Sequence, residues 1–484
     1  MTRLIVGPFN RVEGDLEVQL ELAEGRVASA RVNAPMYRGF EQMLVGREPH
    51  DALVIVPRIC GICSVSQSVA AARAIADAAG VELPPNGVHV TNLMLACENL
   101  ADHVSHFYLF FMPDFARPVY AARAWFGEAQ RRFAPLAGEH ARAALAARQR
   151  WFEIMGTLGG KWPHTQSIQP GGSARAVEAA ERLRLLAKVR EFRAFLEATT
   201  FGAPLEEVAA LDSEAALARW HAADPLRGDL RFFLTLADDL QLAALGRGPG
   251  LALSYGAYRQ PDGSHALAGG VWDEATHTLA VVDLDAIRED ATHAWLAGDT
   301  PLHPREGHTE PRIDKPGGYT WNKAPRLAGR VVETGAIARQ LASGHPLIRD
   351  AVLSQGTNVR NRVLARLLEV ARVLPMMEAW LAALAPREAF FQPDHLPADG
   401  EGVGLTEAAR GALGHWLRVQ RGRIANYQIV APTSWNFSPR DAAGTPGALE
   451  AALVGAPVLQ GEDTPVAVQH VVRSFDPCMV CTVH

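Results

Sequence analysis

Two cysteine pairs at opposite ends of the chain constrain its fold more than any other feature of the sequence. Cys60 and Cys63 stand in the segment PRICGICSV, and Cys478 and Cys481 stand in DPCMVCTVH, with which the 484-residue sequence ends. A Cys-x-x-Cys step brings two sulfurs close enough to bind one metal ion, and four thiolates select soft or borderline metals such as nickel, iron, zinc or copper. A site built from both pairs requires the two ends of a long chain to meet.

Structural zinc and disulfides are the alternatives to a catalytic or redox metal. Zinc sites made of four cysteines usually come from local ribbons, with about 15 to 20 residues between the pairs, whereas most of this chain lies between them. The fifth cysteine, Cys97, lies among apolar residues at helical spacing, which is typical of a buried core thiol. So few cysteines fit a reducing compartment rather than a disulfide framework. The spacing favours a catalytic or redox metal.

The composition excludes several classes of function. The chain is 48% hydrophobic and 21% charged, with a net charge of -6, which argues against general binding of nucleic acid or of a membrane surface. A basic cluster at 182–193 contains glutamates as well and indicates a solvated helix face. The N-terminal residues lack a signal-peptide pattern, and no apolar run is long enough to span a membrane. We therefore expect a cytoplasmic protein.

The hydrophobic pattern predicts a single intertwined α+β domain over residues 1–484, predominantly α, built around a bundle of long helices. Leu16–Leu22 alternates in polarity and is followed by a turn at 23–25 and a second alternating run at 26–32, which predicts a β-hairpin. Apolar residues spaced by three and four between 93 and 111 predict one long helix, and 358–384 predicts another with a possible kink at Pro375. The regions are an N-terminal β region (1–50), a helical region (51–245), a β-rich excursion (248–330) and a helical or mixed region with the C-terminal metal motif (331–484).

Further sequence blocks occur in a fixed order between the two cysteine motifs. They are NRVEG (10–14), YRGFE (37–41), LADH (100–103), KWPHTQSIQPGG (161–172), YTWNKAPR (319–326), RGALGHW (410–416) and YQIVAPTSWNFSPRD (427–441). With RICGIC (58–63) and DPCMVCTVH (476–484), the chain resembles the large subunit of the nickel–iron hydrogenases from about residue 8 to its end. This resemblance argues against a structural zinc site.

The resemblance implies a nickel ion beside an iron ion that carries carbon monoxide and two cyanides, a Ni-Fe(CO)(CN)2 cluster. Cys60 and Cys478 would be terminal nickel ligands, and Cys63 and Cys481 would bridge nickel to iron. Hydrogen would be cleaved heterolytically, and its proton would pass through a terminal thiolate. Glu13 matches the family's proton-gate glutamate near Cys478, where a carboxylic acid can relay a proton; a solvated glutamate in a turn is the alternative.

Other residues match positions around that cluster. Arg410 and Thr433 match donors of hydrogen bonds to the cyanides. Asp102 matches a carboxylate that orients the arginine, and Asp476 matches another carboxylate close to the metals. For both aspartates, capping of a helix or turn is the alternative reading.

A second metal site is implied behind the nickel. Glu41, the main-chain carbonyl of Ile429 and His484 match a magnesium site, although an imidazole is a less usual magnesium ligand than oxygen. His164 matches a histidine that faces the nearest iron–sulfur cluster of a partner. Because the paired cysteines are committed to nickel and iron, the iron–sulfur clusters must belong to a separate small subunit, and we expect a heterodimer.

Departures from the common family pattern resemble the regulatory, hydrogen-sensing hydrogenases. Gln67 replaces a common histidine, and Ile62 and Phe110 replace smaller residues along the gas channel, where larger side chains would exclude oxygen more than hydrogen. The sequence also ends at His484, where most precursors carry an extension that is cleaved off. These features predict a hydrogen sensor with slow hydrogen oxidation that signals to a histidine kinase.

Two other functions remain open. One is an uptake hydrogenase that passes electrons from hydrogen to a carrier. The other is a metal-free, quinone-binding relative like the complex I subunit of the same fold, which the four intact cysteines disfavour.

Overall fold

The N-terminal sheet of this computed structural model, which describes residues 2–484, has three antiparallel strands in the order β1-β2-β3. They are β1 (Thr2–Val6), β2 (Glu17–Ala23) and β3 (Arg26–Asn33). Alternate residues such as Val18 and Leu20 are buried while their neighbours face outward, because successive side chains of a strand point to opposite faces. The predicted hairpin is therefore confirmed.

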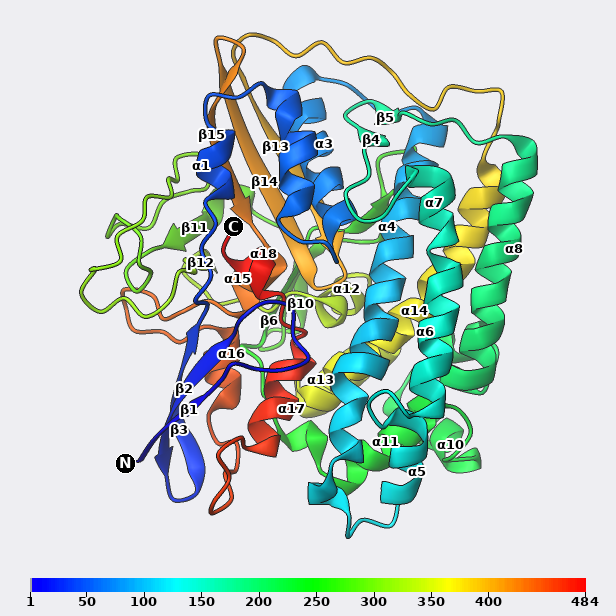
Figure 1. Ribbon diagram of the computed structural model, residues 1–484, viewed down its shortest axis with the longest axis vertical. Coiled ribbons are helices and arrows are strands. Elements are labelled where there is room, and N and C mark those ends of the chain that lie inside the picture. Colours follow the sequence, from blue (N-terminus) through cyan, green and yellow to red (C-terminus); the bar gives the residue numbers. More distant parts are fainter. Residues whose placement is uncertain (1) are drawn as a thin grey trace.

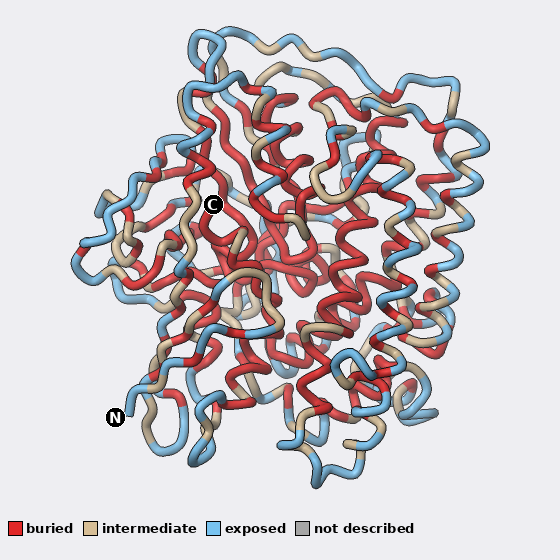
Figure 2. Tube along the Cα trace, viewed as in Figure 1, coloured by how far each residue is buried: buried red, intermediate tan, exposed pale blue. Residues whose placement is uncertain are grey.

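Long helices form the side of the molecule that lies opposite this sheet (Figure 1). The central helix α4 (Pro85–Ser105) is buried along nearly its whole length and packs on α14 (Val359–Ala383). α6 (Glu139–Trp151) and α8 (Ala179–Phe195) cover the outside of this pair (Figures 1 and 2). The long helix expected at 358–384 is confirmed and continues through Pro375. The helix expected through 93–111 ends in the π-helical turn η3 (His106–Phe111).

A second three-stranded antiparallel sheet lies between α3 (Ser64–Ala79) and the flank of the molecule. It consists of β13 (Gly400–Ala408), β14 (Gly411–Gln420) and β15 (Arg423–Val430). The sequence pattern of this region did not predict it, because glycines and buried polar residues interrupt the alternation. A Cβ atom at Gly402 or Gly404 would overlap main-chain oxygens of α3. These glycines therefore allow the helix to lie directly on the sheet.

Short strands make up the flank between 248 and 330. They are β6 (Leu251–Ser254), β7 (Ala257–Arg259), β8 (His265–Leu267), β9 (Gly270–Asp273), β10 (Thr278–Ala280), β11 (Ile287–Asp290) and β12 (Ala324–Leu327), and the pair β4 (Ile168–Gln169) and β5 (Gly172–Ser173) lies elsewhere. The remaining α-helices are α1 (Phe40–Leu44), α2 (Ala52–Ile55), α5 (Phe126–Phe133), α7 (Glu153–Gly159), α9 (Leu205–Ala209), α10 (Glu214–Ala223), α11 (Asp229–Asp239), α12 (Ala336–Ala342), α13 (Pro346–Gln355), α15 (Pro432–Asn436), α16 (Ala448–Leu453), α17 (Val466–Ser474) and α18 (Met479–Thr482). The other helical turns are η1 (Pro49–Asp51), η2 (Val56–Arg58), η4 (Met112–Ala116), η5 (Pro118–Tyr120), η6 (Leu196–Phe201), η7 (Leu242–Ala244) and η8 (Leu284–Ala286).

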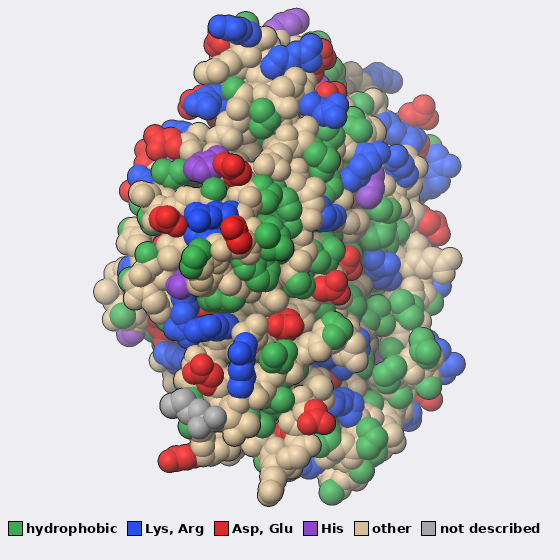
Figure 3. Space-filling view, turned by 60° about the vertical axis from the view of Figure 1, so that its left-hand side comes forward, with side chains coloured by type: hydrophobic (Ala, Val, Ile, Leu, Met, Phe, Trp, Pro, Cys, Tyr) green, Lys and Arg blue, Asp and Glu red, His purple; other side chains and the backbone are tan. Residues whose placement is uncertain are grey.

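The C-terminal residues run through the interior and meet the segment that follows β1 (Figure 1). The main-chain N–H of Glu13 donates to the carbonyl of Pro477 at 3.3 Å, and the N–H of Met479 donates to the carbonyl of Glu13 at 2.7 Å. The terminal residue, His484, is only 6% exposed, although chain ends usually fray. Within residues 2–484 no helix has the length and apolar character that crossing a bilayer requires. On the face shown in Figure 3, basic and acidic side chains are interspersed with apolar ones.

Candidate metal centre

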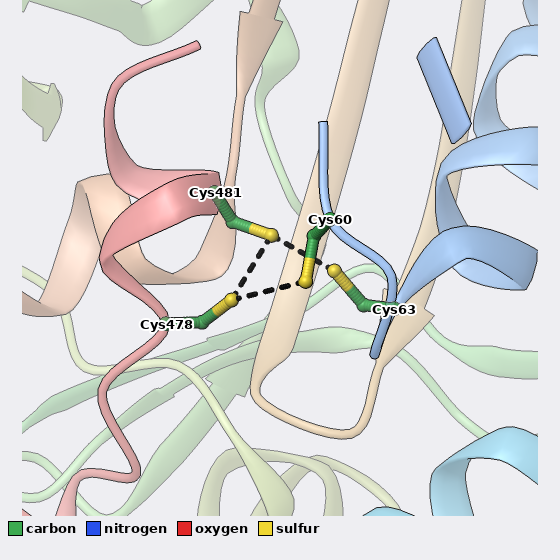
Figure 4. A group of neighbouring side chains, drawn as sticks. All are labelled: Cys60, Cys63, Cys478 and Cys481. Atoms are coloured by element: carbon green, nitrogen blue, oxygen red, sulfur yellow. Dashed lines mark hydrogen bonds between the residues drawn. The ribbon is translucent and has the colours of Figure 1, made fainter. Parts of the chain in front are cut away.

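Four cysteine sulfurs converge in the interior, between the segment that leads into α3 and the segment around α18, beside the hairpin of β13 and β14 (Figure 4). The Sγ atoms of Cys60 and Cys478 lie 3.4 Å apart, those of Cys63 and Cys481 lie 2.8 Å apart, and those of Cys478 and Cys481 lie 3.2 Å apart. All four sulfurs lie within 4.8 Å of one another and belong to free, buried cysteines. The spatial pairing therefore joins one cysteine of each motif to one of the other.

One cysteine of each motif stands directly before a helix. Cys63 directly precedes α3, and Cys478 directly precedes α18. Between the two motifs, the Arg38 guanidinium donates to the carbonyl of Ile59 at 2.6 Å and to the carbonyl of Val480 at 2.5 Å. One side chain thus fastens both cysteine loops to each other.

Full ionisation of the four cysteines requires a cation. Hydrogen bonds from the other thiols, that of Cys478 foremost, lower the pKa of Cys60 well below its usual range. The same neighbours raise the pKa of Cys63 well above its usual range, because a second thiolate would be repelled by the first. Four thiolates can ionise together in this buried space only around a positive charge. The donor set fits soft or borderline metals.

Arg410 lies beside the cluster, between two buried carboxylates. Its side chain donates to Oδ2 of Asp102 at 2.9 Å, and to Oδ1 and the main-chain oxygen of Asp476, both at 3.1 Å. Burial raises the pKa of Asp102, and the charge of Asp476 adds to this effect. Burial would also raise the pKa of Asp476, but Arg410 outweighs it and lowers that pKa. The guanidinium is therefore fixed from two sides.

Two buried polar atoms, one on Asp476 beside Arg410 and one on Thr433 in α15, which packs on α18, have no protein partner among residues 2–484. Oγ1 of Thr433 and Oδ2 of Asp476 are both buried and unpaired. A buried polar atom without a partner is costly and usually marks a missing ligand or solvent molecule. These two atoms are therefore suited to bind a polar ligand or a solvent molecule at this site.

Glu13 is held against the cysteine loop by its main chain. Its backbone forms a parallel β-bridge with Cys478. Burial, followed by the charge of Cys60, raises the pKa of the Glu13 carboxyl, while Arg410 and Arg38 oppose this effect. A carboxyl group that stays protonated to higher pH is suited to pass a proton.

Glu41 and His484 lie together behind the cluster. Oε1 of Glu41 accepts the Ile429 N–H at 2.8 Å and lies 3.2 Å from Nε2 of His484. Nδ1 of His484 is directed at the carbonyl of Cys481, at 3.2 Å. If Nδ1 donates there, Nε2 and the carboxylate are two acceptors that face each other, which requires a proton or a metal cation between them.

A small cavity of about 20 Å³ lies between these groups, which is enough for one ion or one water molecule. Lys323 lines the same cavity, and its Nζ lies 3.8 Å from Glu41 and 3.3 Å from Glu289. Burial raises the pKa of Glu41, but Lys323 and then His484 outweigh burial and lower it to about 2. The site therefore holds a carboxylate that is ionised at neutral pH.

Gln67 belongs to a buried chain of hydrogen bonds on the inner side of α3. Its Oε1 lies 2.9 Å from Nε2 of His415, and Nδ1 of His415 lies 2.7 Å from the hydroxyl of Tyr427. Burial lowers the pKa of His415 to about 3, so the imidazole is neutral, donates to Gln67 and accepts from Tyr427. The amide of Gln67, one helical turn after Cys63, therefore orients a neutral histidine that lies near His484 and Glu41.

Three other residues predicted from the sequence, Ile62, Phe110 and His164, are only partly buried. Ile62 is partly buried between the two cysteines of its motif and packs on the core. Phe110 is partly buried in η3, and its carbonyl accepts a hydrogen bond from Arg11 at 3.1 Å. His164 itself has a left-handed backbone conformation, with φ of 66°, and its N–H donates to the Ser64 hydroxyl at 3.3 Å.

The structure adds one anchoring residue that the sequence analysis did not single out. The carboxylate of Glu98 accepts the N–H groups of Val65 and Ser66 at 2.8 and 2.9 Å and the indole N–H of Trp162 at 3.1 Å. It thereby caps the N-terminus of α3, next to Cys63. In the sequence, this role could have been inferred from the position of Glu98, a charged residue within an apolar helical stretch.

Four buried cysteine sulfurs, with an arginine and carboxyl groups beside them, are typical of a metalloenzyme that carries out redox chemistry. The family model described as "Nickel-dependent hydrogenase" matches residues 38–132 and 135–484. The chain belongs to this family of nickel-dependent hydrogenases. It is the large subunit of such an enzyme, with a nickel–iron active site that acts on hydrogen.

Relatives and solved structures match over the whole chain. The "Periplasmic [NiFeSe] hydrogenase large subunit" of Desulfomicrobium baculatum is 30% identical, with 100% of this chain and 95% of that protein covered. The "Uptake hydrogenase large subunit" of Azotobacter chroococcum mcd 1 is 29% identical, with the same two coverages. The reduced, active Ni-Fe-Se hydrogenase structure from Desulfomicrobium baculatum has a TM-score of 0.87 at 29% identity and 100% coverage of both chains. The predicted α+β fold class is therefore confirmed.

Proposed function

We propose that this hydrogenase large subunit is a hydrogen sensor that oxidises hydrogen slowly and signals to a histidine kinase controlling hydrogenase gene expression. The observation that carries the proposal is the combination of Gln67, bound to a neutral His415, with Ile62 at the cysteine motif. Together with Phe110, these residues resemble the pattern of the hydrogen-sensing hydrogenases.

The four cysteines would bind the nickel–iron cluster, which supplies the site of heterolytic hydrogen cleavage when it is bound. Cys60 and Cys478 would bind nickel terminally, and Cys63 and Cys481 would bridge to iron. The carbon monoxide and cyanide ligands of iron are part of the proposal. The unpaired hydroxyl of Thr433 supports a hydrogen bond to one cyanide.

The surrounding residues orient groups and move a proton. Arg410, fixed by Asp102 and Asp476, would present a charged donor toward the iron ligands. The Cys478 thiol would release its proton to Glu13, whose main chain is bonded to the same loop. The raised pKa of Glu13 supports its role as an intermediate carrier rather than as a permanently ionised carboxylate.

Magnesium is the proposed occupant of the space between Glu41 and His484. The carboxylate, the facing imidazole and the carbonyl of Ile429 would be its ligands, and Lys323 would help to balance the charge of Glu41 and Glu289. A hard cation with oxygen ligands suits this set better than a soft one. Such an ion would tie the C-terminal residue to α1 and so support Cys481.

An iron–sulfur small subunit is the proposed partner, in a heterodimer or a dimer of heterodimers. The cysteine outside the four-cysteine cluster, Cys97, is fully buried in α4, so this chain offers no ligands for an iron–sulfur cluster. His164, near the loop that carries Cys60, is proposed to face the nearest cluster of that partner. The same scarcity of cysteines supports a cytoplasmic location.

An uptake hydrogenase is the second candidate, and two of the relatives named above are uptake or periplasmic enzymes. Hydrogen-driven dye reduction by the purified two-subunit complex, assayed before and after exposure to air, separates the two. Slow activity that air leaves unchanged supports the sensor, whereas fast activity that air abolishes supports the uptake enzyme and contradicts the sensor.

Two double variants test the role of the channel residues. Ile62→Val with Phe110→Leu should make activity sensitive to air, because smaller side chains would widen the path for oxygen. The same pair of replacements at the exposed positions Ile5 and Phe391 is the matched control and should change nothing. Unchanged air resistance in the first variant would show that these two residues do not restrict oxygen.

A further inference from the structure

A cavity of about 510 Å³ lies beside the second half of α3, away from the metal centre. α3 begins next to Cys63, and Arg73 lies about 15 Å further along its axis. The cavity is open to solvent and is lined by residues of α3, the loop that follows it, the first turns of α4, the β7–β8 hairpin and β13. It shares no lining residue with the four-cysteine cluster.

Two arginines line this cavity without an acidic partner. Arg73, partly buried, donates one N–H to the carbonyl of Leu405 at 2.6 Å, and Arg259 lies on β7. Within residues 2–484 no carboxylate lies within ion-pair distance of either guanidinium. Asp77 is one helical turn from Arg73, but it accepts the main-chain N–H of Val403 at 2.8 Å instead. Asp77 and Glu82 line the cavity as exposed residues.

A buried hydroxyl adds an unused donor to the same wall. Thr91 lines the cavity, is 5% exposed, and its Oγ1 has no partner in the described part of the chain. Asn92, beside it, donates to the carbonyl of Arg259 at 2.7 Å and fixes the backbone of that arginine. Because buried polar atoms are normally paired, Thr91 indicates a ligand or ordered solvent in the cavity.

The part of the cavity around His265, Arg73 and Arg259 is positive. Burial, together with the charges of Arg73 and Arg259, lowers the pKa of His265 to about 4. Burial and the charge of Arg259 lower the pKa of Arg73 to about 10. The two guanidinium groups thus repel each other, and an anion placed between them would relieve this repulsion.

An apolar cavity of about 380 Å³ adjoins the first one. The two share His265 and Leu405 as lining residues. The second is lined by Leu279, Val281 and Val282 among others, and Val281 is 91% exposed. A ligand that fills both would carry a charged group at one end and an apolar group at the other.

We propose that these adjoining cavities form a binding site for a small organic anion, a carboxylate or a phosphate ester. Arg73 and Arg259 hold its charged group, Thr91 donates a hydrogen bond to it, and its apolar part lies beyond His265 against Val281. This site is separate from the metal centre, and the proposal does not depend on the sensing function.

Equilibrium dialysis of the purified two-subunit complex tests this site, with phenyl phosphate, phenylacetate, inorganic phosphate and benzyl alcohol as probes. We expect saturable binding of phenyl phosphate or phenylacetate, weaker binding of inorganic phosphate and none of benzyl alcohol. The tighter of the two aromatic anions identifies the charged group that the site prefers.

Three variants locate the binding within the complex. Arg73→Gln and Arg259→Gln should each weaken it by about tenfold or more, since each removes a charge-assisted hydrogen bond. Thr91→Val, which keeps the shape of the side chain, should weaken it by a smaller factor. Arg219→Gln, at an exposed position on α10, is the matched control and should leave affinity unchanged.

Two outcomes would overturn the proposal. One is the absence of saturable binding of both aromatic anions to the wild-type complex. The other is equal affinity in the wild type, Arg73→Gln and Arg259→Gln, which would place the binding elsewhere. Retention of nickel and of hydrogen-driven dye reduction in each variant shows that the complex is still folded, so a loss of binding is local.

Discussion

The Sγ atoms of Cys60 and Cys478 lie 3.4 Å apart although 418 positions separate the two residues in the chain. This contact joins the two ends of the chain. Arg38 donates hydrogen bonds to the main chain of both cysteine loops, and the main chain of Glu13 is hydrogen-bonded to the C-terminal loop. A metal bound between Cys60 and Cys478 would therefore fasten the termini together, and its removal would loosen both.

Replacement of a single sulfur tests the metal ligands. Cys478→Ser should abolish nickel retention, because a serine hydroxyl is a poor ligand for a soft metal and leaves one buried coordination position empty. Metal analysis of the purified complex measures this directly. Cys97→Ser makes the same chemical change at another fully buried position and should keep its nickel. Full nickel occupancy in Cys478→Ser would refute the ligand assignment.

The relay role of Glu13 predicts a loss of activity without a loss of metal. Glu13→Gln keeps the size of the side chain but cannot pass a proton, and it should lower the rate of hydrogen-driven dye reduction by about a hundredfold or more. Its nickel content should match the wild type. Glu21→Gln, on the exposed face of β2, is the control. An unimpaired Glu13→Gln variant would show that protons leave by another route.

Thr433→Val tests whether the unpaired hydroxyl binds a ligand of the iron. Loss of the hydrogen bond should shift one cyanide stretching band in the infrared spectrum while the carbon monoxide band moves less. Thr406 is also buried with an unpaired Oγ1, and Thr406→Val provides a matched control that should leave the spectrum unchanged. Identical spectra of the wild type, Thr433→Val and Thr406→Val would show that Thr433 does not bind a cyanide ligand.

A buried ion pair between α12 and α14 makes stability depend on pH. Glu369 accepts two hydrogen bonds from Arg339, both at 2.8 Å, and lies 3.1 Å from His103. Burial alone would raise the pKa of Glu369, but Arg339 and His103 lower it well below its usual range. Glu369→Gln leaves a buried guanidinium underpaired and should lower the free energy of unfolding by about 3 kcal/mol.

The sign of the pH effect follows from that lowered pKa. A carboxylate whose pKa is lower in the folded state stabilises the protein above its unfolded pKa of about 4.3, and the stabilisation is lost as the pH falls below that value. Urea unfolding should therefore show the full difference between wild type and Glu369→Gln at pH 7 and a smaller one at pH 4. A constant difference over this range would mean that Glu369 is not ionised in the folded protein.

The sequence predicts the parts of this protein in which a regular pattern or a motif is present. Polar and apolar residues alternate in the β2–β3 hairpin, and apolar residues recur at helical spacing in α14. The two Cys-x-x-Cys motifs predict that their four sulfurs share one site. The sheet β13–β15 was missed because Gly402 and Gly404 stand where alternation would place larger residues, and their purpose, close contact with α3, is visible only in three dimensions.

The same limit applies to the metal centre. Arg38 and Glu98 support the cysteine loops through main-chain atoms, and such contacts leave no periodic signal in a sequence. Lys323 shares one carboxylate partner, Glu41, with the proposed magnesium ion, and only the packing of α1 against the segment before β12 reveals this. Residues that act through backbone contacts therefore have to be found in the structure.

Formation of HD from D2 in ordinary water, followed by mass spectrometry on the anaerobic two-subunit complex, tests the central claim most directly. It requires heterolytic cleavage at the four-cysteine centre and exchange of the released deuteron with solvent, but no electron acceptor. The wild type should produce HD, and Cys478→Ser should produce none. Production of HD by Cys478→Ser at the wild-type rate, or its absence from a wild type with full nickel and iron, would contradict the account.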